Sequence, residues 1–221
     1  PLYGDSGAVE GLLCVVSEET ERVIGERRIE MLRQLGMALV GTADLGGVED
    51  AVCSILGANR RDFPFALVYL HGNGIACTPD ARPLLERPWP QETETGQELR
   101  LDDRLSWPTG DWQRPPDEAI ALPIPGAPGR PAIGSLVLGL NPHRRDDTAI
   151  VDIARLIAGQ ISGAMANVDA RQSERRRAER IWSLARDLMV VADSGGIFRV
   201  VNPAWTRILG HPVENVIGRH F

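Results

Sequence analysis

Aromatic residues and cysteines are scarce in this sequence. Phe, Trp and Tyr together make up 5% of its 221 residues, and its three cysteines are Cys14, Cys53 and Cys77. They form no C-x-x-C pair, so the sequence predicts neither a disulfide framework nor a zinc module. We therefore expect reduced thiols that act as small apolar side chains, in a protein of the cytoplasm.

Motifs that bind metals or nucleotides are missing as well. The four histidines, at 71, 143, 211 and 220, are scattered, and no G-x-x-x-x-G-K-[ST] loop occurs. The sequence also contains no phospho-accepting histidine in a helical box and no glycine-rich ATP lobe. These absences predict no metal site, no evident cofactor and no catalytic machinery within these residues.

Positive charge is in deficit, with 24 Lys and Arg residues against 30 Asp and Glu residues and a formal net charge of −6. That balance argues against a general affinity for nucleic acid or for an anionic membrane. The arginine-rich stretch 171–180 is interrupted by Glu174 and Glu179, which favours a solvated helix face. No apolar run approaches the roughly 18–20 residues that cross a bilayer, so we expect no membrane span.

The hydrophobic pattern that is present indicates a mixture of helices and strands. Apolar residues at helical spacing predict helices over about 20–40, 48–56 and 147–186. Short apolar runs predict strands over 12–16, 65–70, 119–124, 133–140, 188–192 and 198–201. We expect Gly72–Gly74 to form a turn, and 79–116 to be loops with one short helix near 91–95.

The long C-terminal helix carries a heptad pattern, with Ile150, Ile157 and Ala164 seven residues apart. Such spacing is typical of a coiled coil, and the same seam continues through Arg171 and Arg175. Like charges on a dimer seam would weaken the coil at that point. The alternative is that the first half of this helix is the core face of a helix packed on its own domain.

Three stretches of the sequence resemble known families of sensor domains. Asp62–Leu70, with Ala119–Leu122 and Ala158–Ile161, resembles a GAF domain, although 72–89 is shorter than in most such domains. Asp187–Asp193, followed by Asn202–Trp205, resembles the opening of a PAS domain. Gly7–Val16, followed by Glu18 and Thr20, resembles the last strands of a PAS domain and its exit motif.

The resemblance implies an α+β fold: a GAF-like antiparallel sheet with flanking helices, long linker helices before and after it, and partial PAS strands at both ends. The implied segments are PAS strands over 1–19, a linker helix over 20–36, a GAF domain over 37–168, a coiled-coil signalling helix over 169–187 and a partial PAS domain over 188–221.

The order PAS, GAF, PAS is similar to the sensor region of bacterial histidine kinases of two-component phosphorelays. It implies a parallel homodimer whose output domain lies elsewhere in a longer protein. Signal relay would involve Glu18, Thr20, Arg171 and Arg175, and a GAF pocket of unknown ligand would involve Tyr69, His71 and Cys77.

Two other functions stay open. The same sensor array can drive another output, such as cyclic-di-GMP turnover. A few GAF proteins instead reduce methionine sulfoxide through pocket cysteines, which would need an accessible thiolate and a resolving partner for Cys77. Cys53 is expected on the apolar face of a short helix, which disfavours this third function.

Overall fold

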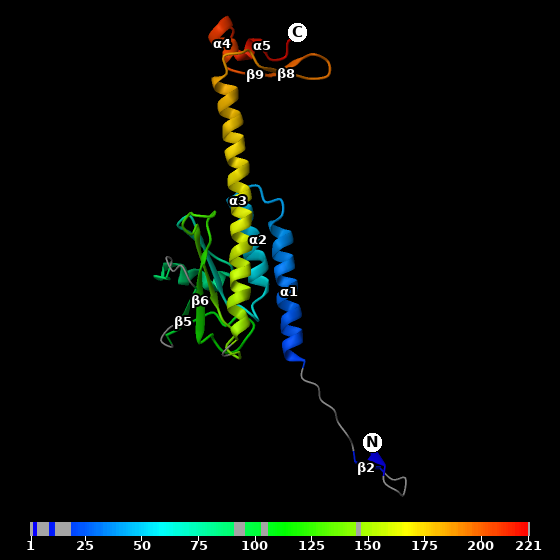
Figure 1. Cartoon of the computed structure of the whole chain (residues 1–221), viewed down its shortest axis with the longest axis vertical. Coiled ribbons are helices and arrows are strands. Elements are labelled where there is room, and N and C mark those ends of the chain that lie inside the picture. The colour runs from blue at the N-terminus through cyan, green and yellow to red at the C-terminus, as the bar shows by residue number, and fades with distance from the viewer. Residues whose placement is uncertain are drawn as a thin grey trace.

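The structure is a computed structural model, and it describes residues 2–3, 9–11, 19–90, 96–102, 106–144 and 147–220. Figure 1 shows an elongated molecule with its two ends far apart. A small hairpin, β1 (Leu2–Tyr3) with β2 (Val9–Gly11), lies at one end. An α+β domain occupies the middle, and the last helix of that domain continues past it toward the C-terminal elements.

The domain is built on a five-stranded antiparallel sheet. In space the strands follow the order β4-β3-β7-β6-β5. Their bounds are Ala66–Leu70 (β3), Asn73–Ala76 (β4), Gln97–Arg100 (β5), Glu118–Ile124 (β6) and Gly134–Gly139 (β7). The predicted GAF-like sheet with flanking helices is therefore confirmed.

Both faces of the three central strands are buried. On β3, Ala66, Val68 and Leu70 face one core, while Phe65, Leu67 and Tyr69 at and beside the strand face a second core. Successive side chains of a strand point to opposite faces, so a strand that is covered on both sides reads as one apolar run. This explains why β3, β6 and β7 were predictable as short, mainly apolar segments.

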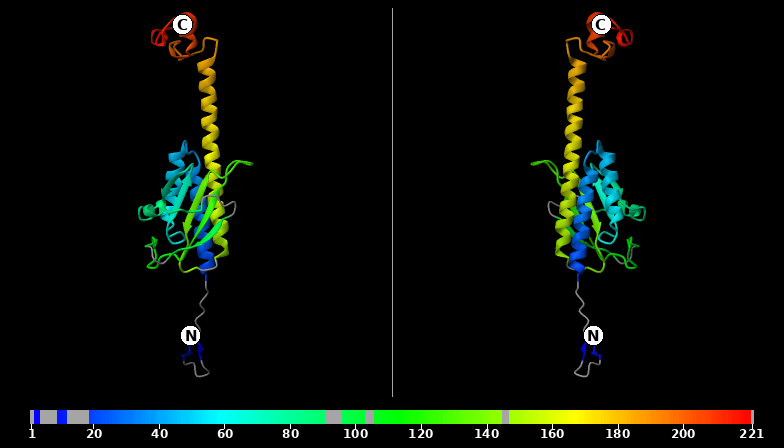
Figure 2. Two further views of the ribbon diagram at one scale, coloured as in Figure 1. Left: turned by 90° about the vertical axis from the view of Figure 1, so that its left-hand side faces the viewer. Right: turned by 90° about the vertical axis from the view of Figure 1, so that its right-hand side faces the viewer.

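Three helices lie on one side of the sheet (Figure 2), two of them packed on the strands and the first packed on those two. They are α1 (Thr20–Leu39), α2 (Leu45–Ala58) and α3 (Thr148–Leu184). The side chains of α1 that face the core recur every three or four residues, as in Ile24, Arg28, Met31 and Leu35. The helix α2 begins earlier than predicted because the Asp44 side chain caps it by accepting a hydrogen bond from the Gly47 N–H, at 2.9 Å.

The other face is covered by the 3-10 helix η1 (Pro79–Glu86) and by the loops before and after β5, which is itself the edge strand of the sheet. Neither element was predicted, and the helix expected near 91–95 lies outside the described residues. Trp89 and Trp107 fill this face beside Phe65, with Phe65 and Trp107 stacked at a centroid distance of 5.8 Å. Their indole N–H groups donate to backbone carbonyls of Leu84 and Asp102, so the tryptophans attach these loops to the core.

The turn after β3 is shorter than predicted. His71 and Gly72 form it, while Asn73 and Gly74 pair with β3 as the start of β4. Both turn residues have positive φ angles, 50° for His71 and 84° for Gly72, as a two-residue type I′ hairpin turn requires. Pro123 lies near the end of β6, beyond the residues that pair with β5, although β6 itself is an inner strand.

The helix α3 is one continuous element of 37 residues, close to the predicted bounds. The heptad residues of its first half, including Ile150, Ile157 and Ala164, are buried in the core of the domain. The coiled-coil interpretation is therefore wrong for this half, because these side chains already pack on the domain's own sheet. By length and hydropathy alone α3 could cross a membrane, with a mean hydropathy of 1.3 in its most apolar 18-residue window.

Beyond α3 the chain forms a small hairpin and two short helices. The strands are β8 (Val190–Ala192) and β9 (Phe198–Val201), and the helices are α4 (Ala204–Leu209) and α5 (Val213–Val216). The predicted strands 188–192 and 198–201 correspond to this hairpin. At the other end, the predicted strand 12–16 lies outside the described residues, and Leu2–Tyr3 pairs with β2.

Candidate functional site

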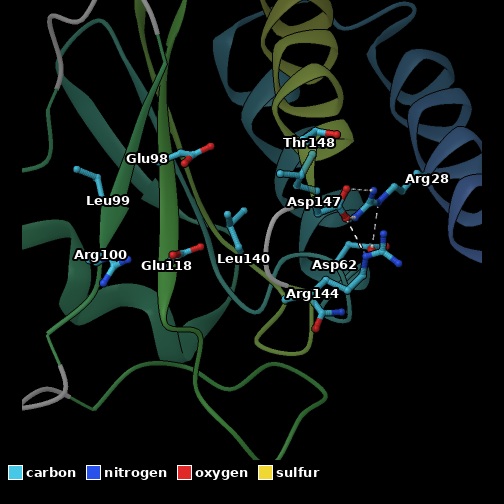
Figure 3. A pocket seen from close by; sticks show the side chains of 12 residues that line it. Arg28, Asp62, Glu98, Leu99, Arg100, Glu118, Leu140, Arg144, Asp147 and Thr148 are labelled. Carbon is cyan, nitrogen blue, oxygen red and sulfur yellow. Dashed lines mark hydrogen bonds and ion pairs between the residues drawn. The ribbon is translucent and has the colours of Figure 1, made fainter. Parts of the chain in front are cut away.

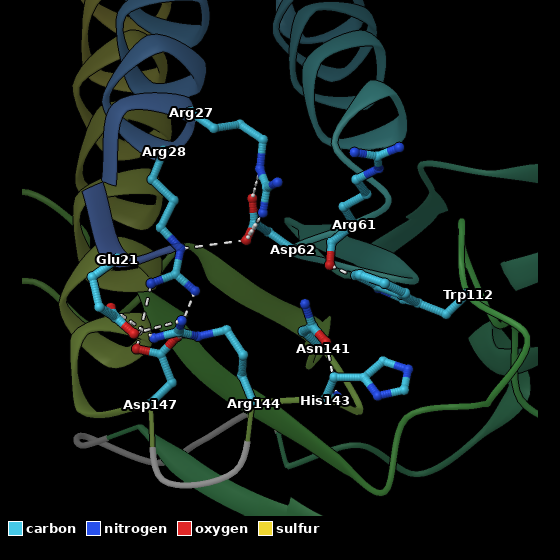
Figure 4. A network of polar contacts seen from close by, with 10 residues as sticks. All are labelled: Glu21, Arg27, Arg28, Arg61, Asp62, Trp112, Asn141, His143, Arg144 and Asp147. Atoms are coloured by element: carbon cyan, nitrogen blue, oxygen red, sulfur yellow. Dashed lines mark hydrogen bonds and ion pairs between the residues drawn. The ribbon is translucent and has the colours of Figure 1, made fainter. Parts of the chain in front are cut away.

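A network of ion pairs joins the first turns of α1 to the start of α3 (Figure 4). The α1 helix contributes Glu21, Arg27 and Arg28, and the segment before α3 contributes Arg144 and Asp147. Asp62, in the connection between α2 and β3, completes the network from the sheet side. Three parts of the fold that are far apart in sequence therefore meet at one end of the domain.

Arg28 lies at the centre of this network. Its Nη2 donates to Asp147 Oδ2 at 2.6 Å and its Nη1 to Asp147 Oδ1 at 3.3 Å. Its Nε lies 3.4 Å from Asp62 Oδ1. The side chains of Arg28, Asp62 and Asp147 are 5%, 1% and 8% exposed. Because water hardly reaches them, each charge is stabilised by the opposite charges of the network.

Two further arginines hold the outer sides of these carboxylates. Arg27 donates to both oxygens of Asp62 at 2.7 Å, in the two-pronged geometry that planar guanidinium groups favour. Arg144 donates through Nε to Asp147 at 2.9 Å and through Nη1 and Nη2 to Glu21 at 2.8 and 3.0 Å. Asp147 is at the N-cap position of α3, but its side chain makes no capping hydrogen bond, because its carboxylate accepts hydrogen bonds from Arg28 and Arg144.

The charges of the network shift the affinities of its members for protons. Burial by itself raises the pKa of Asp147, but hydrogen bonds and charges from Arg28 and Arg144 outweigh it and leave that pKa below its usual range. The hydrogen bond from Arg144 lowers the pKa of Glu21. The hydrogen bond to Asp62 raises the pKa of Arg27 despite its partial burial. Charged forms are thus favoured at Asp147, Glu21 and Arg27.

A cavity of about 500 Å³ lies beside the network (Figure 3). Arg28, Asp62 and Asp147 line one side, while Glu98 and Arg100 of β5 and Glu118 of β6 line the other. Its walls carry both signs of charge, together with apolar side chains such as Leu99, Leu140 and Ile150. Such a lining suits a small polar molecule better than a flat apolar one.

A second cavity, of about 580 Å³, lies between the β3–β4 turn, the 125–134 segment and α3. Tyr69 and His71 are among its lining residues, together with Ser135, Ser162 and Asp169. The structure therefore brings two of the three predicted pocket residues to one cavity. It does not bring Cys77 to them.

Cys77 instead contacts Cys53. The two sulfur atoms lie 3.1 Å apart, with Cys53 on α2 and Cys77 just after β4, and both side chains are partly exposed. The hydrogen bond between them lowers the pKa of Cys53, while the same bond and burial raise the pKa of Cys77. Cys53 was expected on the apolar face of a short helix, and the structure places it partly exposed beside Cys77.

The predicted relay residues are spread along the two long helices. Thr20 is the first residue of α1, and Glu18 lies outside the described residues. Arg171 Nη1 donates to the backbone carbonyl of Thr42 at 3.3 Å, where the α1–α2 connection meets α3. Arg175 pairs with Glu179 one helical turn away on the exposed surface of α3.

Sequence reasoning missed the network itself. Asp62 was noted only as the first residue of the GAF-like stretch 62–70, Asp147 only as the start of a predicted helix, and Arg27, Arg28 and Arg144 were not singled out. The available signal was Arg28, which stands on the apolar stripe of α1 between Ile24 and Met31. A charged residue at a core position of a helix predicts a buried partner of opposite charge. Among the described residues no group of three or more His, Cys, Asp or Glu could hold a metal ion.

Comparison with solved structures identifies the class of fold. The structure resembles the GAF domain of a protein described as a sensor histidine kinase from Pseudomonas syringae pv. tomato, with a TM-score of 0.51 and 15% sequence identity. The match covers 71% of this chain and 97% of that one. The central domain thus has a GAF-like fold.

A second likeness, to the DhaR(N)–DhaL complex of E. coli, has a TM-score of 0.36 and 14% identity over 93% of this chain and 72% of that one. A TM-score this low supports no argument about the fold. No protein-family model matches the sequence, and no curated protein sequence matches it.

Proposed function

We propose that this chain is a sensory and relay segment of a bacterial signal-transduction protein. In this proposal residues 37–168 form the sensing GAF domain, and the helices over 20–36 and 169–187 carry the signal in and out. Residues 1–19 and 188–221 belong to two incomplete PAS domains. The output is a histidine kinase in the same cytoplasmic protein.

The observation that carries the proposal is the network around Arg28. It joins α1, which enters the domain, to α3, which leaves it, and it also holds Asp62 at the edge of the sheet. A change in the domain that moves Asp62 or Asp147 must move α1 relative to α3, because their charges are buried and share partners. Removing one partner of a buried ion pair destabilises a protein by about 3–5 kcal/mol. A free energy of that size is enough to shift the equilibrium between two arrangements of a helix pair.

The polar cavity beside the network is the place where we propose that a small molecule acts. Arg28, Asp62 and Asp147 line it directly, so a charged ligand there would compete with the ion pairs. Such a ligand would bind one arrangement of the helices better than the other, which is the condition for a signal. The second cavity, with Tyr69 and His71, lies farther along α3 and is the alternative site.

Dimerisation is supported by the surface of the helix pair. Gln160 of α3 donates to the Leu32 carbonyl of α1, so the two helices lie side by side. Ile29 on α1 is 67% exposed and Leu156 on α3 is 54% exposed. Gly159 and Gly163 of α3 border open space, which leaves room for another helix to approach. We propose that a second copy of the chain packs there in parallel.

The relay is tested by amide hydrogen exchange in the part of α3 beyond the domain. Leu184 is 36 residues from Thr148, about 54 Å along a helix. We expect Arg28→Met to accelerate exchange over 169–184 as well as at the network. The matched control is Arg33→Met, which removes an exposed pair with Glu30. Changes confined to residues near Arg28 would contradict a relay.

The output is tested separately on the parent protein. If a kinase core follows this segment, Arg28→Met should change the rate of autophosphorylation several-fold, and Arg33→Met should leave it unchanged. A cyclic-di-GMP enzyme or another output domain in the parent sequence would contradict the kinase proposal. It would leave the relay proposal intact, because that rests on hydrogen exchange in this chain alone.

A further inference from the structure

The thiol pair of Cys53 and Cys77 lies outside the network and both cavities. Cys53 lies on α2 beside the row of buried residues that includes Val52, and it is itself partly exposed. Cys77 directly follows the edge strand β4. They are 24 residues apart in sequence, yet their sulfur atoms are 3.1 Å apart. Both are partly exposed, so a small oxidant can reach them.

The backbone around the pair fixes this approach. The Cys77 N–H donates to the Ala66 carbonyl at 2.9 Å, which ties Cys77 to β3. On the helix side Gly57 lies one turn after Cys53, and a Cβ added there would come within 2.6 Å of the Cys77 carbonyl oxygen. Only a glycine allows α2 to approach the end of β4 this closely. The two sulfur atoms are thus held together by the fold rather than by flexible side chains alone.

From this geometry we propose that Cys53 and Cys77 form a reversible disulfide in response to hydroperoxides. The sulfur of Cys53 attacks the peroxide oxygen, the O–O bond breaks, and the leaving oxygen takes a proton to give water or an alcohol. Cys77 then attacks the resulting sulfenic acid, the S–O bond breaks, and a second water leaves. The two thiols lose two electrons and two protons in all, and the peroxide gains them.

The roles of the two sulfurs follow from their surroundings. The hydrogen bond lowers the pKa of Cys53, whereas Glu49 and Asp50 on the same helix, together with burial, oppose that shift. Cys77 keeps its proton, because the bond and burial both raise its pKa. Cys53 is also the less buried of the two thiols, so we assign it as the residue that is oxidised first and Cys77 as the one that resolves it. The acidic neighbours make this thiolate a modest nucleophile, as suits a switch and not a fast peroxidase.

The bond would close a loop that contains Asp62. Residues 53–77 include the end of α2, the connection with Asp62, and the strands β3 and β4. Restraining this loop limits the movement of Asp62, which holds Arg27 and Arg28 of α1. The chemistry of the pair does not depend on what α1 and α3 are connected to, so it stands apart from the proposed signalling output.

The test uses the reduced full chain, treated with a few equivalents of hydrogen peroxide and mapped by mass spectrometry without reductant. We expect a peptide cross-linked through Cys53 and Cys77, full reversal by dithiothreitol, and a melting temperature higher by about 5–10 °C when oxidised. Hydrogen exchange around residues 59–63 should slow. Sulfinic acid at either position without a cross-link, or pairing with Cys14 in place of this bond, would overturn the proposal.

Cysteine variants test the order of events. Cys14→Ser is the matched control and should form the same cross-link as the unmodified chain. Cys77→Ser should accumulate a sulfenic acid at Cys53 that dimedone traps, whereas Cys53→Ser should leave Cys77 unlabelled. Equal labelling of both single variants would overturn the assigned roles. Should a variant fail to fold, the cross-link in the unmodified chain still decides the proposal.

Discussion

The guanidinium group of Arg28 and the carboxylate of Asp147 form a buried two-pronged ion pair across 119 residues of sequence. The pair connects the third turn of α1 to the residue just before α3. The two side chains are 5% and 8% exposed, so water cannot take the place of either partner in the pair. The stability of the domain and the relative position of its two long helices therefore depend on the same contact.

Replacing Arg28 with methionine should lower the free energy of unfolding by about 2–4 kcal/mol. The charge of Asp147 and part of that of Asp62 would stay buried with fewer partners, and an unpaired buried charge is costly. Arg27 would still pair with Asp62 and Arg144 with Asp147. The loss should therefore stay below the roughly 5 kcal/mol that a fully unpaired buried charge can cost. Urea denaturation followed by circular dichroism measures the change.

Arg33→Met is the control for this measurement. It removes an arginine from the same helix, but its partner Glu30 is solvent-exposed, so the loss should be within about 0.5 kcal/mol. Equal losses for the two variants would show that the Arg28 network adds nothing beyond an ordinary surface pair.

Acid should weaken the domain through Asp147. Its pKa is lower in the folded chain than in the unfolded chain, where a carboxyl group titrates near pH 3.9. The stabilisation is therefore fully present above about pH 4 and is lost as the pH falls through the folded pKa. Asp147→Asn should be less stable than the unmodified chain at pH 7, and the difference should shrink below about pH 4.

Unfolding curves at pH 7, 5, 4 and 3 check this, each with Asp152→Asn as control. Asp152 pairs with Arg155 on the exposed surface of α3, so its loss should have little effect at any of these pH values. A difference between Asp147→Asn and the unmodified chain that stays constant down to pH 3 would contradict the assigned titration.

Much of the fold could be predicted because it depends on local patterns. The strands β3, β6 and β7 are apolar runs covered on both faces, and α1 has an apolar stripe at helical spacing. The strand β5 escaped prediction, since Gln97–Arg100 is largely exposed at the sheet edge and its sequence is polar. Pairing with β6 makes it a strand, and that is a tertiary effect.

The candidate site could be predicted less well, because it is assembled from partners distant in sequence. Arg28 meets Asp147 only when α1 and α3 pack together, and Cys53 meets Cys77 only when α2 lies over the end of β4. The heptad of α3 left two interpretations open for a related reason. A stripe that faces a partner helix and a stripe that faces a sheet of the same domain have similar spacing.

Replacing glycine with alanine should have opposite effects on stability at Gly57 and at Gly25. Gly57→Ala should destabilise the domain by about 1–3 kcal/mol, because the added methyl group would overlap the Cys77 carbonyl. Gly25→Ala in α1 meets no atom within 4 Å and should stabilise by up to about 1 kcal/mol through helix propensity. Thermal unfolding of both variants measures this, and a stabilising Gly57→Ala would show that α2 can move away from β4.

The surface of α3 beyond the domain allows a last test, on the proposed dimer. Arg171 and Arg175 continue the seven-residue pattern past the point where the core ends, and both are exposed. In a parallel dimer they would face their own copies, and like charges across a seam weaken it. Replacing both with leucine should tighten the dimer about 10- to 100-fold by sedimentation equilibrium, because buried leucines replace the repulsion.

The matched control is Arg176→Leu with Arg180→Leu, which makes the same change in composition and charge on another side of the helix. Each of these residues follows a seam position by five residues, which places it on another side of the helix. That double variant should therefore leave the dissociation constant of the dimer nearly unchanged. Equal tightening by both pairs would mean that added leucines make the helix generally sticky. No effect from either pair would mean that α3 does not meet a second copy along this seam, and the relay would then have to pass through a single chain.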